Sequence, residues 1–102
     1  MLFRSTASEG SLTESPVYLR DLVNLANRHR AAALIVAHNH PSGNPRPSPS
    51  DKALTEELVF MGRLLRIAVL DHLIIGDDRY FSFADEGLID QYASAFDKRR
   101  AR

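Results

Sequence analysis

A short apolar run, Ala32–Ala37, constrains the fold of this 102-residue chain more than any other feature. All six of its residues are apolar, which is typical of a strand buried on both faces. A helical pattern precedes the run: Ser15-Pro16 is a favoured helix start, and apolar residues then recur at helical spacing to about Arg30. A buried strand that follows a helix indicates an α/β domain.

The rest of the chain continues this alternation. Leu2–Arg4 can open a strand before the first helix. After the buried strand we expect a helix with apolar residues from Leu54 to Leu65, a strand at Ile67–Ile75, a turn with a short strand at Arg79–Phe83, and a helix at Asp85–Phe96. This order predicts an α/β domain with a small mixed sheet.

The size and charge of the chain limit its organisation and its partners. We expect one domain at residues 1–97 and a basic tail at residues 98–102, which is either solvated or in contact with nucleic acid. Thirteen Lys and Arg balance thirteen Asp and Glu, so the net charge does not attract nucleic acid. No apolar run approaches the roughly 18 residues of a membrane span, and no signal peptide is evident. We therefore expect a cytoplasmic protein with no membrane partner.

Cysteine is absent from the chain, which restricts the metal sites that it can build. Disulfides and thiolate zinc sites are excluded, and so are the zinc nucleobase deaminases, which need cysteine ligands. Any metal must be held by His, Asp or Glu.

Three such residues surround a proline-rich loop. His38 and His40 follow the buried strand, and side chains two residues apart in extended backbone project from the same face. Asp51 stands eleven residues beyond His40, where a compact loop can bring it back. Two imidazoles and one carboxylate leave a zinc ion with a fourth position for water, which is the pattern of catalytic zinc.

Other interpretations of these residues exist. Ser48 suits the N-cap of the next helix and Asp51 its third position, so both can serve only to begin that helix. A carboxylate has two oxygens, so capping and metal binding are compatible, and both interpretations stay open. The letters His-Asn-His around Asn39 also suggest a nuclease, but those nucleases space the three residues far apart. Asp71-His72 within an apolar strand is better interpreted as a hydrogen-bonded structural pair, and His29 at a helix end has no assigned chemistry.

The register of the motif also resembles a known family. His38-x-His40, seven residues, Ser48, two residues and Asp51 matches the JAMM (MPN-plus) metalloprotease motif. The segments "LFRSTASEGS", "AAALIVAHNHPSGNPRPSPSD" and "LLRIAVLDHLIIGDDRYFSFADEGLI" resemble the RadC branch of that family, from residue 2 to about residue 90. The resemblance implies a cytidine-deaminase-like α/β/α fold, a zinc ion held by His38, His40 and Asp51, and a catalytic Ser48 that stabilises the oxyanion.

The resemblance implies a zinc-dependent hydrolase of peptide or isopeptide bonds, with a peptide or protein as substrate, although RadC proteins also carry a DNA-repair label. The general-base glutamate of JAMM enzymes precedes the segment that matches Leu2–Arg4, and Glu9 and Glu14 fall downstream of that place. We therefore expect a fragment or a naturally short form that binds metal and hydrolyses slowly. The alternatives are a non-catalytic scaffold that keeps the metal, or a DNA-repair accessory that uses the basic tail. A missing first strand would also expose a sheet edge, which favours a homodimer.

Overall fold

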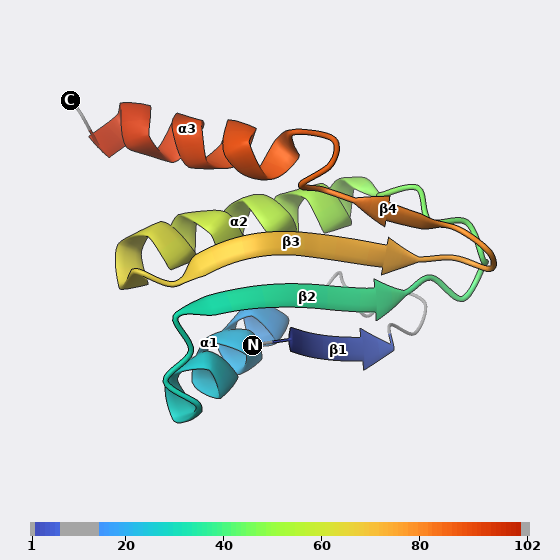
Figure 1. The fold of residues 1–102 in the computed structure, drawn as a ribbon, viewed down its shortest axis with the longest axis horizontal. Coiled ribbons are helices and arrows are strands. Elements are labelled where there is room, and N and C mark those ends of the chain that lie inside the picture. The colour runs from blue at the N-terminus through green and yellow to red at the C-terminus, as the bar shows by residue number, and fades with distance from the viewer. Residues whose placement is uncertain (1, 7–14, 101–102) are drawn as a thin grey trace.

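The computed structural model describes residues 2–6 and 15–100, which form one sheet and three helices (Figure 1). Its elements, in chain order, are β1 (Leu2–Thr6), α1 (Ser15–Arg28), β2 (Ala33–Asn39), α2 (Pro49–Leu65), β3 (Ala68–Ile75), β4 (Tyr80–Ser82) and α3 (Leu88–Arg100). Each element expected from the sequence is present, with ends shifted by a few residues. The α/β class is confirmed.

The four strands are arranged in the order β1-β2-β3-β4. β1, β2 and β3 run parallel, whereas β4 pairs antiparallel with β3, so the expected mixed sheet is also confirmed. β2 has a neighbour on each side, which explains why its sequence is almost continuously apolar. The carboxyl ends of the parallel strands lie at the same end of the sheet, and His38 lies at that end of β2.

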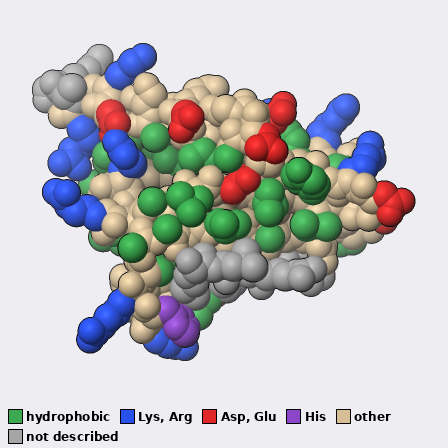
Figure 2. Space-filling view, in the orientation of Figure 1, with side chains coloured by type: hydrophobic (Ala, Val, Ile, Leu, Met, Phe, Trp, Pro, Cys, Tyr) green, Lys and Arg blue, Asp and Glu red, His purple; other side chains and the backbone are tan. Residues whose placement is uncertain are grey.

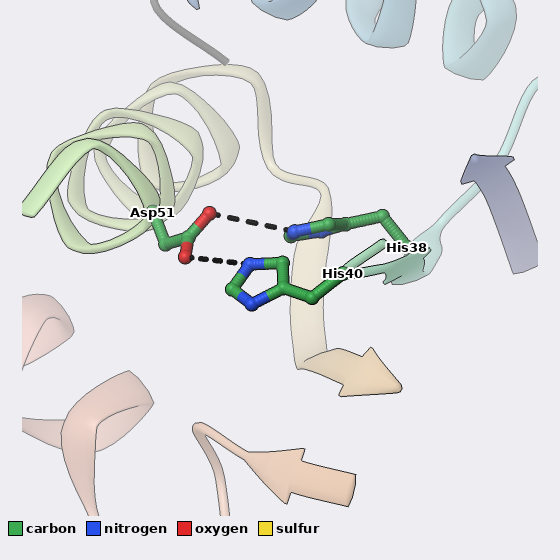
Figure 3. A group of neighbouring side chains, drawn as sticks. All are labelled: His38, His40 and Asp51. Atoms are coloured by element: carbon green, nitrogen blue, oxygen red, sulfur yellow. Dashed lines mark hydrogen bonds and ion pairs between the residues drawn. The ribbon is translucent and has the colours of Figure 1, made fainter. Parts of the chain in front are cut away.

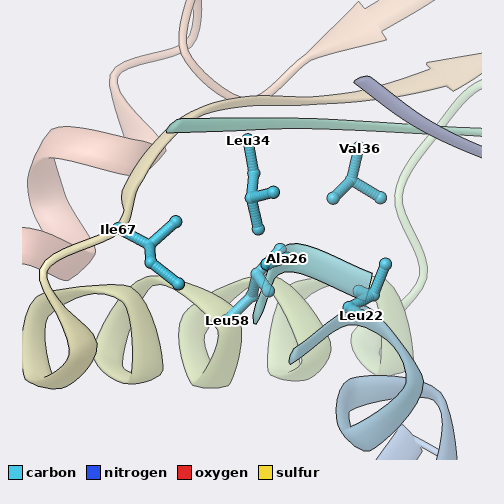
Figure 4. Packing of buried hydrophobic residues seen from close by; sticks show 6 residues of the cluster. All are labelled: Leu22, Ala26, Leu34, Val36, Leu58 and Ile67. Atoms are coloured by element: carbon cyan, nitrogen blue, oxygen red, sulfur yellow. The ribbon is translucent and has the colours of Figure 1, made fainter. Parts of the chain in front are cut away.

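The first core lies between the sheet and the helices α1 and α2 (Figure 4). Leu34 and Val36 point from β2 toward Ala26 of α1 and Leu58 of α2, and all four side chains are buried. Strand order advances in one direction from β1 to β3, and crossovers between parallel strands are right-handed. The crossover helices α1 and α2 must therefore cover the same face.

The second core joins α3 to α2 and β3. Its buried members are Val59, Ile74, Phe83, Ile89 and Tyr92. Ile74 stands beside His38 in the register of β2 and β3, on the face that also carries Val36. All three described helices thus pack on one face of the sheet.

The opposite face of the sheet is covered by none of the described helices. The described residues therefore form two layers, whereas the family resemblance implies a third. Figure 2, in the orientation of Figure 1, shows hydrophobic side chains gathered over the middle of the sheet. One of the exposed apolar residues is Leu70, 53% exposed, which stands at a register irregularity between β2 and β3. Exposed apolar area of this kind is typical of contact surfaces.

Residues 98–100 of the expected basic tail belong to α3, which continues to Arg100. The guanidinium of Arg99 lies 5.5 Å from the centre of the Phe60 ring, and that of Arg100 lies 5.7 Å from the centre of the Phe96 ring. Such cation–π contacts hold two of the basic groups against the protein. None of the described helices is both long and apolar enough to cross a membrane.

The homodimer expected from the sequence stays a prediction. β1 and β4 are the two edge strands of the described sheet, and edge strands present backbone groups that can pair with another chain. We expect static light scattering at high protein concentration to give twice the mass of one chain. A monomeric mass across the concentration range would contradict edge pairing.

Candidate metal centre

His38 and His40 lie where β2 ends. His38 is buried, with 1% of its side chain exposed, whereas His40 stands just past the strand and keeps 17% exposed. The centres of the two rings are 5.1 Å apart. The backbone N–H of His40 donates to the carbonyl of Ile75, which fastens this end of β2 to β3. The pair therefore offers one buried and one partly accessible imidazole.

Asp51 reaches the same place from the first turn of α2. Ser48 caps this helix: its hydroxyl accepts from the Asp51 N–H at 3.1 Å, and its own N–H donates to Asp51 Oδ2 at 2.7 Å. This is the reciprocal capping box that the sequence favours. The Asp51 carboxylate is fully buried, and only one of its oxygens takes part in the cap. The capping interpretation is confirmed, and it leaves Oδ1 for a second role.

The structure brings His38, His40 and Asp51 together into one group that could hold a metal ion (Figure 3). One ligand atom from each residue lies within 4.8 Å of the others. His38 Nε2 is 3.4 Å from Asp51 Oδ1, and His40 Nε2 is 3.1 Å from Asp51 Oδ2. In Figure 3 both rings point their Nε2 edges toward the carboxylate. In the described part of the chain, no glutamate belongs to this group.

The Asp51 carboxyl is an anion at neutral pH. Burial on its own raises the pKa of this carboxyl, but His38 and the hydrogen bonds with Ser48 outweigh burial and lower the pKa to about 2. A buried anion requires a compensating positive partner, and the ring nitrogens beside it are the nearest groups.

The hydrogen bonds around the group leave polar atoms that a cation could bind. His40 Nδ1 lies 2.8 Å from the backbone carbonyl of Asn44, which can only accept, so Nδ1 carries the hydrogen and a neutral His40 turns an Nε2 lone pair toward Asp51. His38 Nε2 and Asp51 Oδ1 are buried and have no hydrogen-bond partner among the described residues. A metal ion between them would satisfy the lone pair of His40, the Nε2 atom of His38 and the Oδ1 atom of Asp51 together.

His72 of β3 also belongs to the site, although its sequence context predicted only a structural role. Its imidazole is fully buried, with Nε2 2.9 Å from His38 Nδ1 and Nδ1 2.6 Å from the hydroxyl of Thr55. Its ring stacks on Phe83, with 5.0 Å between centres and 7° between planes. The register of two parallel strands could have revealed it, because His72 pairs with Val36, two residues before His38 on the same face.

Asp71 has a structural role, as expected, but its carboxylate does not pair with the His72 ring. That carboxylate accepts from the backbone N–H of His72 at 2.7 Å, the hydroxyl of Ser82 at 2.6 Å and the N–H of Ala84 at 2.9 Å. Neighbouring residues in a strand point to opposite faces, so the His72 ring is directed toward His38 instead. Asp71 therefore binds the segment that follows β3, whereas His72 contacts the metal group.

We expect the metal-free protein to lose stability as the pH falls from 6.5 toward 3. Burial lowers the pKa of the His72 imidazole from 6.5 to about 3, with a smaller contribution from His38. In this interval the unfolded chain takes up a proton at His72 while the folded chain does not, so acid favours unfolding. Urea denaturation in the presence of a chelator measures the effect. His72→Leu should show a weaker pH dependence between these limits, and equal dependence in both proteins would contradict the assignment.

Two glycines hold the proline-rich loop against the β3–β4 turn. Gly43 has φ +80°, and its N–H donates to the carbonyl of His40 while its own carbonyl accepts from Asp77 N–H. A Cβ on Gly76 would lie 2.3 Å from the Gly43 carbonyl oxygen and 2.8 Å from Pro45 Cδ. Any larger residue at position 76 would displace the loop that connects His40 to α2.

Two other expectations from the sequence concern His29 and the carboxylates Glu9 and Glu14. His29 follows the end of α1, where its N–H donates to the Leu25 carbonyl, and it is not part of the metal group. Glu9 and Glu14, the carboxylates considered as replacements for the general base, lie outside the described residues.

Comparison with known proteins agrees with the motif. Residues 1–88 match the family model described as the RadC-like JAB domain. A UPF0758 protein of Desulforamulus reducens is 47% identical over 89 residues, which are 87% of this chain and 39% of the relative. The UPF0758 protein of Geobacter sulfurreducens is 50% identical over 82 residues, which are 80% of this chain and 36% of the relative. The chain thus spans little more than a third of the length of these relatives.

Proposed function

Because the chain belongs to the family of RadC-like JAB domains, we propose that it is the zinc-binding domain of a hydrolase that cleaves peptide or isopeptide bonds in a protein substrate. One observation carries the proposal: His38, His40 and Asp51 bring possible ligand atoms within 4.8 Å of one another, and two buried atoms of this group have no hydrogen-bond partner among the described residues.

The chemistry of the donor set favours zinc. Mg²⁺ and Ca²⁺ prefer sites built from oxygen, whereas two imidazoles and one carboxylate form a familiar zinc set with one position open. His40 is the ligand at the accessible side of the site, because part of its side chain is exposed. A substrate would therefore approach past His40.

A zinc ion bound by these residues supplies Lewis acidity, which polarises a carbonyl and makes water a better nucleophile at neutral pH. The chain itself contributes the groups around that ion. Asp51 supplies the negative charge, and the bond from His40 to the Asn44 carbonyl keeps the His40 ring in place. Ser48 stands at the N-cap beside Asp51, and the hydroxyl hydrogen of Ser48 is free of the two capping bonds. We assign to that hydroxyl the stabilisation of the developing oxyanion.

The general base is the part of the mechanism that the described residues do not supply. The family resemblance places this glutamate before the segment that matches β1, and the relatives are much longer than this chain. Hydrolysis is therefore a proposal for the longer protein, whereas metal binding is a proposal for this chain.

A non-catalytic scaffold that retains the metal is the second candidate, and the lack of a glutamate in the described metal group favours it. A DNA-repair accessory has weaker support, because the basic groups of Arg99 and Arg100 lie over Phe rings. The scaffold and the hydrolase both bind zinc but differ in activity.

Two measurements test the proposal. Protein purified without added metal should contain about one zinc per chain by elemental analysis, and a metal-free product that takes up no added zinc would contradict the zinc site. The full-length Geobacter sulfurreducens relative should then cleave a library of peptide and isopeptide substrates in a chelator-sensitive manner. A zinc-loaded relative without such activity would favour the scaffold.

A further inference from the structure

A continuous line of buried hydrogen bonds connects His38 to the helix that carries Asp51. His38 Nδ1 contacts His72 Nε2 at 2.9 Å, and His72 Nδ1 contacts the Thr55 hydroxyl at 2.6 Å. The Thr55 hydroxyl then donates to the backbone carbonyl of Asp51 at 2.7 Å, one helical turn earlier in α2. The side chains of His38, His72 and Thr55 are all essentially buried, so no solvent competes for these bonds.

The directions of these bonds follow from one group that can only accept. The Asp51 carbonyl has no hydrogen, so the Thr55 hydroxyl must donate to it and can then only accept from His72 Nδ1–H. A neutral His72 that carries its hydrogen on Nδ1 has a lone pair on Nε2. That lone pair can be satisfied only if His38 donates from Nδ1. When both rings are neutral, this is the only arrangement of hydrogens in which all of these hydrogen bonds form.

We propose that His72 and Thr55 are positioning residues that hold the hydrogen of His38 on Nδ1, so that the Nε2 lone pair is always directed at the metal position. The inference rests on the proposed metal function of His38. In this proposal His72 accepts the Nδ1 hydrogen of His38, as the Asn44 carbonyl accepts the Nδ1 hydrogen of His40.

The arrangement has two consequences for metal binding. A ligating imidazole must offer a lone pair, so a His38 that carries its hydrogen on Nε2 would have to move that hydrogen before zinc could bind. The line also ends on the backbone of Asp51, so it ties a ligand of β2 to the helix that supplies the carboxylate ligand. Stacking of His72 on Phe83 keeps the plane of the connecting ring fixed.

The first test needs no metal. Long-range ¹H–¹⁵N NMR spectra distinguish the two tautomers of a neutral histidine, and they can be recorded on the chelator-treated protein at about pH 8, where ordinary imidazoles are neutral. We expect Nδ1–H tautomers for both His38 and His72. An Nε2–H tautomer at His38 in the wild-type protein would overturn the inference.

The second test removes one hydroxyl that touches no metal-ligand side chain. Thr55→Val keeps the shape of the side chain but leaves a buried His72 Nδ1–H without an acceptor, which favours the other tautomer of His72. His72 would then donate from Nε2, and His38 would carry its hydrogen on the metal-binding nitrogen. We expect a population of the Nε2–H tautomer at His38 and a loss of zinc affinity of about 10–100-fold, as is common for outer-shell partners of metal ligands.

Thr55→Ser is the matched control, because it shortens the side chain but restores the hydroxyl. Thr55→Ser should restore the Nδ1–H tautomer of His38 and most of the zinc affinity. A purely structural role of Thr55 would not explain such a recovery. Circular dichroism should show that both variants fold. Unchanged tautomers in Thr55→Val, or equal zinc affinity in the Val and Ser variants, would overturn the inference. If instead the tautomers respond as expected and no variant binds zinc, the proposed metal function is wrong while the hydrogen-bond assignment holds.

Discussion

Asp51→Asn is expected to lower the zinc affinity of this chain by at least about 100-fold, since even the loss of an outer-shell partner costs about 10–100-fold. Asn is nearly the same size as Asp, and its carbonyl oxygen can still accept from the Ser48 N–H. The substitution therefore removes the one negative charge of the ligand group while keeping its shape and the helix cap. Competition titration against a zinc chelator measures the affinity. His38→Ala, which deletes a ligand atom outright, should have an effect at least as large.

Asp97→Asn is the control for a general effect of charge. Asp97 is about half exposed and forms an ion pair with Arg63 at the surface, away from the metal group. Its neutralisation should leave the zinc affinity unchanged, because this ion pair lies at the surface, where ion pairs contribute little, and it touches no ligand. Stoichiometric zinc in Asp51→Asn with wild-type affinity would rule out the ligand set.

We expect the zinc-loaded full-length relative of Geobacter sulfurreducens to hydrolyse its substrate about 10²–10⁴ times faster than this chain, which is the usual contribution of a general base. The reason is that no glutamate among the described residues belongs to the metal group, whereas the family resemblance places a general-base glutamate at the site of the longer protein. Initial rates at equal zinc occupancy give the comparison. In the relative, substituting by Gln the glutamate that the family resemblance places upstream of the motif should reduce the rate to the level of this chain.

The serine of the relative that matches Ser48 provides a second, separable control. Its replacement by Ala should lower the rate by about 10²–10³-fold, as for the loss of one oxyanion donor, without loss of bound zinc. Equal rates for this chain and the relative would contradict the role assigned to the glutamate. A relative that hydrolyses nothing would favour the scaffold.

Much of the metal group could be predicted from the sequence because its determinants are local. His38 and His40 share a face because they are two residues apart at the end of a strand. Ser48 and Asp51 begin a helix by their own spacing, and that helix start places the carboxylate. Of the two interpretations of Asp51 that the sequence left open, the cap is confirmed. The metal-ligand interpretation stays a prediction, which the other oxygen allows because it has no hydrogen-bond partner among the described residues.

The layering of the domain was only partly predictable. The alternation of helix and buried strand indicated the α/β class, and right-handed crossovers require α1 and α2 to share a face once the strand order is known. The strand order itself depends on which strands pair, and pairing is a long-range property. The two layers of the described residues follow from that order, not from any local pattern.

Local periodicity, helix caps and the spacing of ligating residues were thus sufficient to determine the elements and the three candidate ligands, because each depends on residues close in the sequence. The tertiary structure alone decided how His72 and Thr55 meet His38, and how Gly43 and Gly76 hold the loop. Those contacts join residues far apart along the chain, so they exist only after β2 and β3 have paired and α2 has packed beside them. The fold therefore decides which nitrogen of the His38 ring carries the hydrogen, whereas the sequence decides only that a histidine stands there.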